Sequence, residues 1–200
     1  MSKQLPTIRT PRLLLRPFVL EDAPALHELV KEREIASTTL NIPHPYEEEM
    51  AKVWISNHAP RWEKQEMAVF AITEASAGLV GTISLRLELA HQRGELGYWI
   101  GIPFWGKGYA TEATRAVIKF GFEHMKLNRI HAAHLTRNPA SGRVMLKVGM
   151  TFEGVLREHI LKWGEFEDVA KYSILRREYD SQGPFEIDTE IVSREDQVPS

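Results

Sequence analysis

Residues Phe104–Ala113 read FWGKGYATEA, in which two glycines flank one lysine. The stretch follows a run with strand periodicity and precedes residues 110–126, the strongest helical pattern in the chain. Glycines let the backbone come close to another group, and the first N–H groups of a helix attract an anion. The stretch therefore predicts a site for a group such as a pyrophosphate, which needs no metal there. A tight turn without a ligand is the alternative interpretation.

Two nucleotide-binding motifs resemble this stretch only in part. Gly101–Lys107 matches the G-x-x-x-x-G-K pattern of a P-loop, but the next residue is Gly108, where a P-loop carries a hydroxyl for magnesium. A dinucleotide-binding G-x-G-x-x-G fingerprint requires glycine where this chain has Thr111. The sequence disfavours both motifs, although magnesium-dependent binding of ATP would restore the P-loop as an explanation.

The strand expected before the turn, residues 94–102, has two different faces, because successive side chains of a strand point to opposite sides. One face carries Glu95, Gly97, Trp99 and Gly101. The other face carries Leu96, Tyr98, Ile100 and Ile102. Glycine inside a strand often marks the close approach of another group. The two glycines therefore predict free space beside this strand, next to the turn.

The composition limits the class of protein. The chain has 200 residues, of which 43% are hydrophobic, and its net charge of -2 gives no overall basic field for a nucleic-acid backbone. The absence of cysteine excludes disulfides, thiolate metal sites and a cysteine nucleophile. The start lacks a signal-peptide pattern, and no run reaches the roughly 18 apolar residues of a membrane span. We therefore expect a cytoplasmic protein.

The periodicity of the apolar residues predicts the order of the elements. Strands are expected at residues 12–18, 67–73, 79–87, 94–102, 130–136, 152–161 and 166–175. Helices are expected at residues 23–32, 46–57, 110–126 and 140–148, with Asp22 as the cap of the first. A strand–helix–strand crossover normally makes a parallel pair. The predicted fold class is therefore α/β (α+β), a mixed sheet with helices on its faces.

One domain is expected in residues 1–179, followed by an acidic tail in residues 180–200. The tail has six acidic residues and one arginine, which is typical of a solvated segment. Residues 185–192 alternate enough to form an edge strand instead. The sequence leaves these two alternatives open.

A second motif begins at Asn138, which is followed by Pro139. Asparagine at the N-cap and proline at the first helical position make a good helix start. Capping alone would account for Asn138, and Ser141 is compatible with a plain surface position. These two residues gain a functional interpretation only together with the glycine turn.

The ordered set of motifs resembles the GNAT acetyltransferases, and within them the ribosomal-protein N-acetyltransferase branch (the RimJ/RimL type). The resemblance rests on TPRLLLRPF at residues 10–18 with Asp22, GELGYWIGIPFWGKGYATEA at 94–113, NPAS at 138–141, KVG at 147–149, Asp168 and Tyr172. It extends from about Thr7 to Tyr179, nearly the whole chain. The general family has Gln or Arg where this chain has Pro103. Proline at that position resembles the pattern of this branch.

The resemblance implies a mixed, mostly antiparallel sheet whose fourth and fifth strands form a splayed parallel pair that holds acetyl-CoA. The glycine turn would then bind the diphosphate of coenzyme A. The implied cofactor-binding residues are Ile100, Ile102, Trp105, Gly106, Lys107, Gly108, Tyr109, Ala110, Asn138 and Ser141.

The implied reaction is transfer of an acetyl group from a thioester to a primary amine, by direct attack in a ternary complex. Glu95 is the candidate base, acting through water, because it lies on the glycine side of the strand. A surface carboxylate without a catalytic role is the alternative for Glu95. The resemblance assigns Ser141 as the proton donor to the leaving thiolate and Asn138 as a hydrogen-bond partner of the cofactor. Tyr109 is an alternative proton donor.

The preferred acceptor is the N-terminal α-amine of a ribosomal protein, since an α-amine loses its proton more readily than a lysine side chain. The expected acceptor pocket involves residues 31–62 and the hairpin near Trp163. Its candidate aromatic residues are Tyr46, Trp54, Trp62 and Trp163. A small amine, such as an antibiotic, a polyamine or an amino acid, is one alternative acceptor. A non-catalytic sensor of acyl-CoA is another alternative function.

No metal site is expected, because His131 and His134 are three residues apart on a strand and point to opposite faces. Neither direct nucleic-acid binding nor membrane attachment is expected. The chain is expected to be a monomer or a homodimer.

Overall fold

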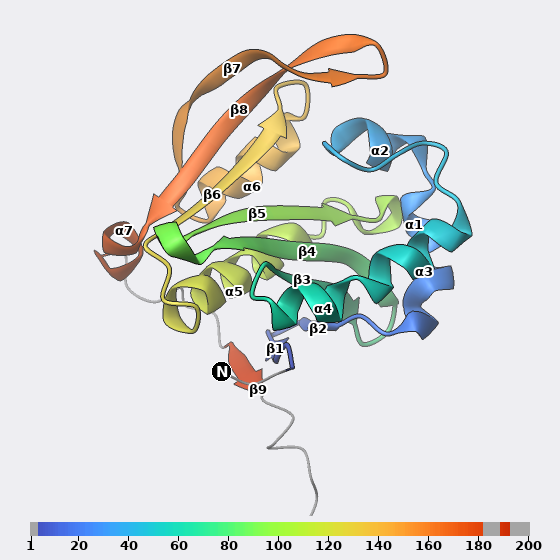
Figure 1. Cartoon of the computed structure of the whole chain (residues 1–200), viewed down its shortest axis with the longest axis horizontal. Helices are drawn as coiled ribbons and strands as arrows, with labels where there is room; N and C mark the ends of the chain where they lie inside the picture. Colours follow the sequence, from blue (N-terminus) through green and yellow to red (C-terminus); the bar gives the residue numbers. More distant parts are fainter. Residues whose placement is uncertain (1–3, 182–188, 193–200) are drawn as a thin grey trace, which may run out of the picture.

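The computed structural model describes residues 4–181 and 189–192 (Figure 1). Its strands are β1 Thr7–Arg9, β2 Leu13–Pro17, β3 Met67–Glu74, β4 Gly78–Glu88, β5 Arg93–Ile100, β6 Arg129–Leu135, β7 Thr151–Lys162, β8 Glu165–Leu175 and β9 Glu190–Val192. Its α-helices are α1 Ala23–Val30, α2 Arg33–Thr38, α3 Glu48–Ser56, α4 His58–Glu63, α5 Tyr109–Glu123, α6 Pro139–Lys147 and α7 Arg176–Ser181. No described helix is long and apolar enough to cross a membrane.

The described strands form one sheet in the order β7-β8-β6-β5-β4-β3-β2-β1-β9. All neighbours pair antiparallel except β5 and β6, which are parallel. That parallel pair is short: it joins Arg93–Leu96 to Arg129–Ala132, after which the two strands diverge (Figure 1). The predicted mixed sheet is confirmed.

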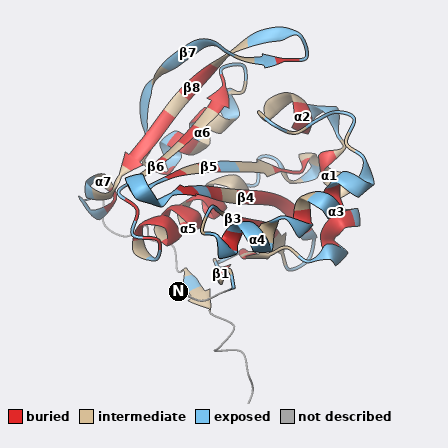
Figure 2. Ribbon diagram, in the orientation of Figure 1, coloured by how far each residue is buried: buried red, intermediate tan, exposed pale blue. Residues whose placement is uncertain are grey.

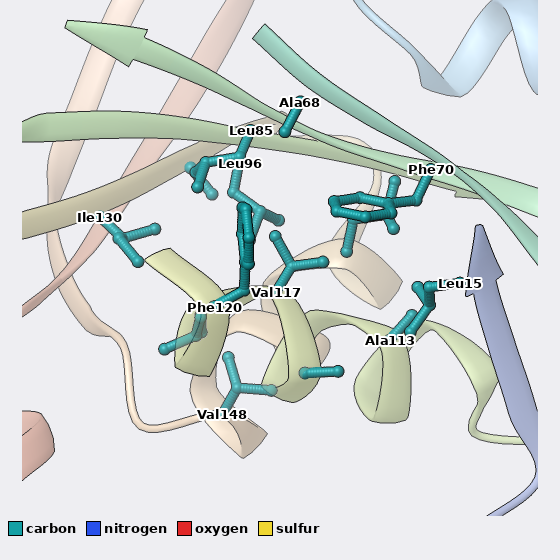
Figure 3. Packing of buried hydrophobic residues seen from close by; sticks show 14 of the residues in the cluster. Leu15, Ala68, Phe70, Leu85, Leu96, Ala113, Val117, Phe120, Ile130 and Val148 are labelled. Atoms are coloured by element: carbon teal, nitrogen blue, oxygen red, sulfur yellow. The ribbon is translucent and has the colours of Figure 1, made fainter. Parts of the chain in front are cut away.

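Helices cover both faces of the sheet, as the alternation along β3 requires. Phe70 belongs to a buried cluster with Val117 and Phe120 of α5, whereas the next residue, Ala71, belongs to a second cluster with α1 and α3. Figure 3 shows the side chains of β3, β4 and β5 directed at α5. Phe70 and Phe120 meet edge to face, with ring centroids 5.7 Å apart. This packing fixes the position of α5 and so of the turn that precedes it.

One expected strand end is wrong for a local reason. The strand expected to reach Ile102 ends at Ile100, because a 3-10 helix at Ile102–Phe104 follows and the amide of Phe104 donates to the Gly101 carbonyl at 2.9 Å. Asp22 is the N-cap residue of α1, as expected, but its side chain makes no cap bond. Its two oxygens instead accept from Arg16, each at 2.7 Å. The helices α2 and α4 were not predicted, because each has only six residues.

The C-terminal end of the described chain adds a strand to the sheet. Glu190–Val192 pairs antiparallel with Thr7–Arg9 of β1 in the same chain. Of the segment considered as an edge strand, residues 185–188 lie outside the described residues. At the opposite edge, β7 is exposed along most of its length (Figure 2).

Candidate active site

A cleft of about 660 Å³ opens where β5 and β6 diverge. One wall consists of the second half of β5, the glycine turn and the start of α5. The opposite walls come from α6 and from the segment between α2 and α3. The cleft therefore joins two regions that are far apart in sequence, and it contains most of the residues singled out above.

The glycine turn has the conformation that its sequence indicates. Gly106 has φ 75° and Gly108 has φ 81°, a left-handed region that other residues adopt at a cost. Gly108 is the N-cap of α5, and no side chain caps this helix. Gly108, Tyr109 and Ala110 all line the cleft. The first N–H groups of a 15-residue helix therefore lie beside the cleft, where the helix dipole favours an anion.

Trp105 anchors the turn to the end of β5. Its indole Nε1 donates to the Ile100 carbonyl at 2.5 Å, and 49% of the residue stays exposed. Both Trp105 and Ile100 line the cleft. Ile102 and Lys107 do not line it: Ile102 packs against the cluster of α1 and α3, and the Lys107 ammonium lies 5.2 Å from the centre of the Phe104 ring. The geometry therefore supports a contact between a ligand in the cleft and Trp105 or Ile100. It indicates no such contact for the side chains of Ile102 and Lys107.

Ser141 lies in the first turn of α6, where its hydroxyl contacts β5. Tyr98 Oη is 2.9 Å from Ser141 Oγ, and it also donates to the Ser141 carbonyl at 3.1 Å. Burial raises the pKa of Tyr98 to about 12, which keeps the phenol protonated at neutral pH. Sequence reasoning assigned no role to Tyr98, although its place on the apolar face of β5 was predicted. Its partner could not be foreseen, since it is 43 residues away.

Asn138 caps α6 and also holds a second element. Its Oδ1 accepts from the Ser141 amide at 3.4 Å, and its Nδ2 donates to the Thr38 carbonyl at 3.3 Å. The neighbouring Arg137 donates to the Ser37 carbonyl at 2.6 Å and to Glu167 at 2.7 Å. The C-terminal end of α2 is thereby tied to the start of α6. No sequence pattern indicated this contact, because α2 itself was not predicted.

Glu95 lines the cleft from the other face of β5. Its register neighbours are Arg86 on β4 and His131 on β6. The pKa of His131 is lowered, mainly by burial and against the opposing effect of Glu95, so this imidazole is neutral at pH 7. Glu95 and Tyr98 point to opposite faces of β5, so they reach the cleft from its two sides.

The four aromatic residues expected near the acceptor have separate environments. Tyr46 and Trp54 line the cleft, and burial raises the pKa of Tyr46. Trp62 is only 8% exposed and packs near Phe120 in the core. Trp163 lies in the turn of the β7–β8 hairpin, 49% exposed and outside the residues that line the cleft.

His134 lines the cleft from β6 and is buried. Its Nδ1 lies 2.7 Å from the Leu135 carbonyl, and its Nε2 has no hydrogen-bond partner among the described residues. His131, three residues earlier on the same strand, is less buried than His134. Within residues 4–181 and 189–192, no three His, Asp or Glu residues are grouped to hold a metal ion.

Comparisons with known proteins agree with this architecture. The family model described as Acetyltransferase (GNAT) domain matches residues 12–151. YoaA of Bacillus subtilis (strain 168), an uncharacterized N-acetyltransferase, is 32% identical over 86% of this chain and 97% of that protein. A crystal structure of a GNAT-family acetyltransferase from Bacillus anthracis superposes with a TM-score of 0.76, at 31% identity, over 86% of this chain and 99% of that one.

Two further relatives carry names that state an acceptor. YdaF of Bacillus subtilis (strain 168), provisionally named a ribosomal N-acetyltransferase, is 33% identical over 62% of this chain and 69% of that protein. Spermidine N(1)-acetyltransferase of Vibrio cholerae is 24% identical over 84% of this chain and 95% of that protein. The family model spans more than half of the chain, and YoaA matches most of it. The chain therefore belongs to the GNAT family and is an N-acetyltransferase.

Proposed function

We propose that this N-acetyltransferase moves the acetyl group of acetyl-CoA to the N-terminal α-amine of a protein, with ribosomal proteins as the first class to test. The donor half of the proposal rests on the glycine turn and on the divergence of β5 and β6. The acceptor half rests mainly on one observation: of the described residues that line the cleft, Glu95 is the only carboxylate.

The cleft fits the donor in shape and in charge. Gly106 and Gly108 have positive φ, and the uncapped start of α5 offers N–H groups to a diphosphate. Beyond Leu96, the edge of β5 that faces β6 has no strand partner among the described residues, which leaves backbone groups after Leu96 for an extended amide-containing chain such as pantetheine. The Ile100 carbonyl is excluded, because it already accepts from Trp105 Nε1. These residues would hold acetyl-CoA, which supplies an activated thioester when it is bound.

The remaining chemistry belongs to side chains of the cleft. Glu95 takes a proton, directly or through water, from the acceptor ammonium group, and the neutral amine then attacks the thioester carbonyl to form the N–C bond. The nitrogen loses its second proton to water as the amide forms. Ser141 donates its hydroxyl proton to the sulfur as the C–S bond breaks. Tyr98 lies 2.9 Å from Ser141 Oγ and, being protonated, can return a proton to it. Water then restores the proton of Tyr98. The chain has no cysteine to form an acyl-enzyme, which supports direct transfer.

The charges of the cleft support a monocationic acceptor over a polyamine. Besides Glu95, the charged residues that line it are Arg86, Arg143 and Lys147. A spermidine-like acceptor carries several positive charges and would need more than one carboxylate to match them. An α-amine also costs about 1 kcal/mol to deprotonate at pH 7, against about 5 kcal/mol for a lysine side chain. A single carboxylate base is therefore better suited to the α-amine.

The similarity to spermidine N(1)-acetyltransferase keeps a small amine as the second candidate. The test uses isotopically labelled acetyl-CoA with three acceptors: a ribosomal protein extract, the same extract with its α-amines blocked, and spermidine. We expect label on protein N-termini, mapped by mass spectrometry, and its loss after blocking. Faster release of coenzyme A with spermidine than with the extract would overturn the proposed acceptor. Absence of label in all three would overturn the assignment of this acceptor class altogether.

A further inference from the structure

The segment Thr10–Arg12 contacts the start of α5, a hundred residues away in sequence. Glu112 lies in the first turn of α5 and is only 8% exposed. Its Oε1 accepts from Thr10 Oγ1 at 2.7 Å and from the Arg12 amide at 2.9 Å, and its Oε2 accepts from Arg12 Nε at 2.6 Å. Both carboxylate oxygens are thus held by the segment that joins β1 to β2.

The same arginine also holds the glycine turn. Arg12 Nη1 donates to the Lys107 carbonyl at 2.8 Å, and its guanidinium lies 5.1 Å from the centre of the Tyr109 ring. A Cβ atom placed on Gly108 would lie 3.4 Å from Arg12 Nη2. One side chain therefore connects a buried carboxylate in α5 with the carbonyl between the two glycines of the turn.

This arrangement matters because the turn is where the diphosphate is proposed to bind. A carboxylate in the first turn of a helix favours the helix dipole, but it repels an anion that approaches the same helix end. The ion pair with Arg12, at 2.6 Å, opposes that repulsion. Glycine has many conformations to lose, so the hydrogen bond to the Lys107 carbonyl also restrains a turn that is otherwise flexible.

We propose that Arg12 is a positioning residue of the diphosphate site, which neutralises Glu112 and fixes the turn in its ligand-binding conformation. The inference rests on the proposed binding of acetyl-CoA at this turn. It assigns a function to the segment Thr10–Arg12, in addition to its structural position before β2.

A matched control lies four residues further along the chain. Arg16 pairs with a buried carboxylate, that of Asp22, through two hydrogen bonds of 2.7 Å each from Nη1 and Nη2. Arg12 likewise pairs with a buried carboxylate, although it does so through Nε and Nη2 to one oxygen of Glu112. Arg16 contacts neither the turn nor the cleft among the described residues. Loss of Arg16 therefore reports what an arginine–carboxylate pair contributes to folding alone.

The experiment measures binding of acetyl-CoA by calorimetry and binding of acetyl-pantetheine, which lacks the diphosphate, by displacement. We expect Arg12→Ala to weaken acetyl-CoA about 10–100-fold, Arg12→Lys to weaken it less, and neither to change acetyl-pantetheine more than about twofold. In the double variant Arg12→Ala/Glu112→Gln, removal of the unpaired charge should restore part of the lost affinity. Arg16→Ala should lower the melting temperature and leave acetyl-CoA binding unchanged.

Three results would overturn the inference: unchanged acetyl-CoA affinity in folded Arg12→Ala, equal weakening of both ligands, or a double variant that binds acetyl-CoA no better than Arg12→Ala. The wild-type protein tests the underlying function separately. If it binds acetyl-CoA no more tightly than acetyl-pantetheine, the diphosphate site itself is wrongly assigned, whatever the variants do.

Discussion

The two halves of the cleft are built from different parts of the chain. The donor half, residues 105–110 and 138–141, consists of a glycine turn and two helix starts, and α5 is held by the central core. The proposed acceptor half, residues 38–54, consists of a loop and one helix, and it meets the proposed donor half through Asn138 and Thr38. The donor half offers mainly backbone groups, whereas the acceptor half offers side chains such as Tyr46 and Trp54.

This difference indicates which substitutions should affect binding of one substrate without affecting binding of the other. A backbone site is damaged by changes in backbone conformation and tolerates most side-chain changes. A side-chain site responds to the size and charge of individual residues. Variants in one half should therefore alter one substrate and spare the other.

The largest effect is expected for Gly108→Val in the donor half. Gly108 has φ 81°, which valine resists, so the turn must change and its N–H groups turn away from the diphosphate. Loss of two hydrogen bonds to a charged group costs about 3–6 kcal/mol, or about 10²–10⁴-fold in acetyl-CoA affinity measured by calorimetry.

The chain supplies a matched control in Gly78→Val. Gly78 has φ 69° at the first residue of β4, directly after the turn from β3, and a Cβ atom there meets nothing within 4 Å. It carries similar backbone strain, so it should lower stability without changing acetyl-CoA binding. Equal weakening of acetyl-CoA by both valine variants would contradict the backbone account of the donor half.

Ser141→Ala should lower turnover about 10²-fold and leave the affinity for acetyl-CoA almost unchanged, because the proton is needed only when the C–S bond breaks. The loss is limited, since a thiolate whose thiol has a pKa near ~8.5 leaves readily without help. Tyr98→Phe removes the hydroxyl that contacts Ser141 Oγ at 2.9 Å and should produce a smaller loss of turnover. Steady-state kinetics combined with calorimetry separates the two quantities. A drop in acetyl-CoA affinity that matches the drop in turnover would make Ser141 a binding residue instead.

Glu95→Gln tests the border between the two halves through pH. The amide keeps the shape of the side chain but cannot accept a proton, so turnover at pH 7 should fall about 10²-fold. As pH rises above the α-amine pKa of ~7.7–8.0, neutral amine becomes abundant and the base matters less. Wild type and variant should converge to within about tenfold by pH 9–10. A ratio of rates that stays constant through pH 10 would remove Glu95 from the role of base.

The donor half was also the half that the sequence could predict. Gly106 and Gly108 encode the turn locally, because positive φ and an uncapped helix start follow from the residues themselves. The parallel pairing of β5 and β6 followed from the order of elements. The same local reasoning failed at Ile102, where Pro103 favours a 3-10 helix over a longer strand.

The acceptor half depends on contacts that no local pattern encodes. The six-residue α2 is too short to show a period, and its C-terminal carbonyls are held by Arg137 and Asn138 from a distant segment. Trp54 and Trp62 look alike in sequence, yet one lines the cleft and the other is buried in the core. Long-range contacts also determine the partners of Tyr98 and Arg12, which is why neither was assigned a role.

The smallest effect is expected when the pH is lowered. It should be a loss of stability next to the acceptor half. His58 at the start of α4 packs against Trp54 and Phe18, and its ring nitrogens have no hydrogen-bond partner among the described residues. Burial, with a smaller effect of Arg61, lowers the pKa of His58 from 6.5 to about 4. The folded state thus binds fewer protons than the unfolded state between these values, so stability falls as pH drops from 6.5 toward 4.

At pH 5 this linkage should cost the wild-type protein at most about 2 kcal/mol of unfolding free energy, at 1.36 kcal/mol per pKa unit. His58→Phe keeps a ring against Trp54 but cannot titrate, so it should lose less stability between pH 7 and pH 5 in urea unfolding followed by tryptophan fluorescence. An equal loss in both proteins would exclude His58 as the cause. If the two halves are independent, the loss of stability near Trp54 at pH 5 should weaken binding of the acceptor. Binding of acetyl-CoA should then stay constant. Equal weakening of the binding of both substrates would mean that the two halves respond together, coupled by the hydrogen bond from Asn138 to the Thr38 carbonyl.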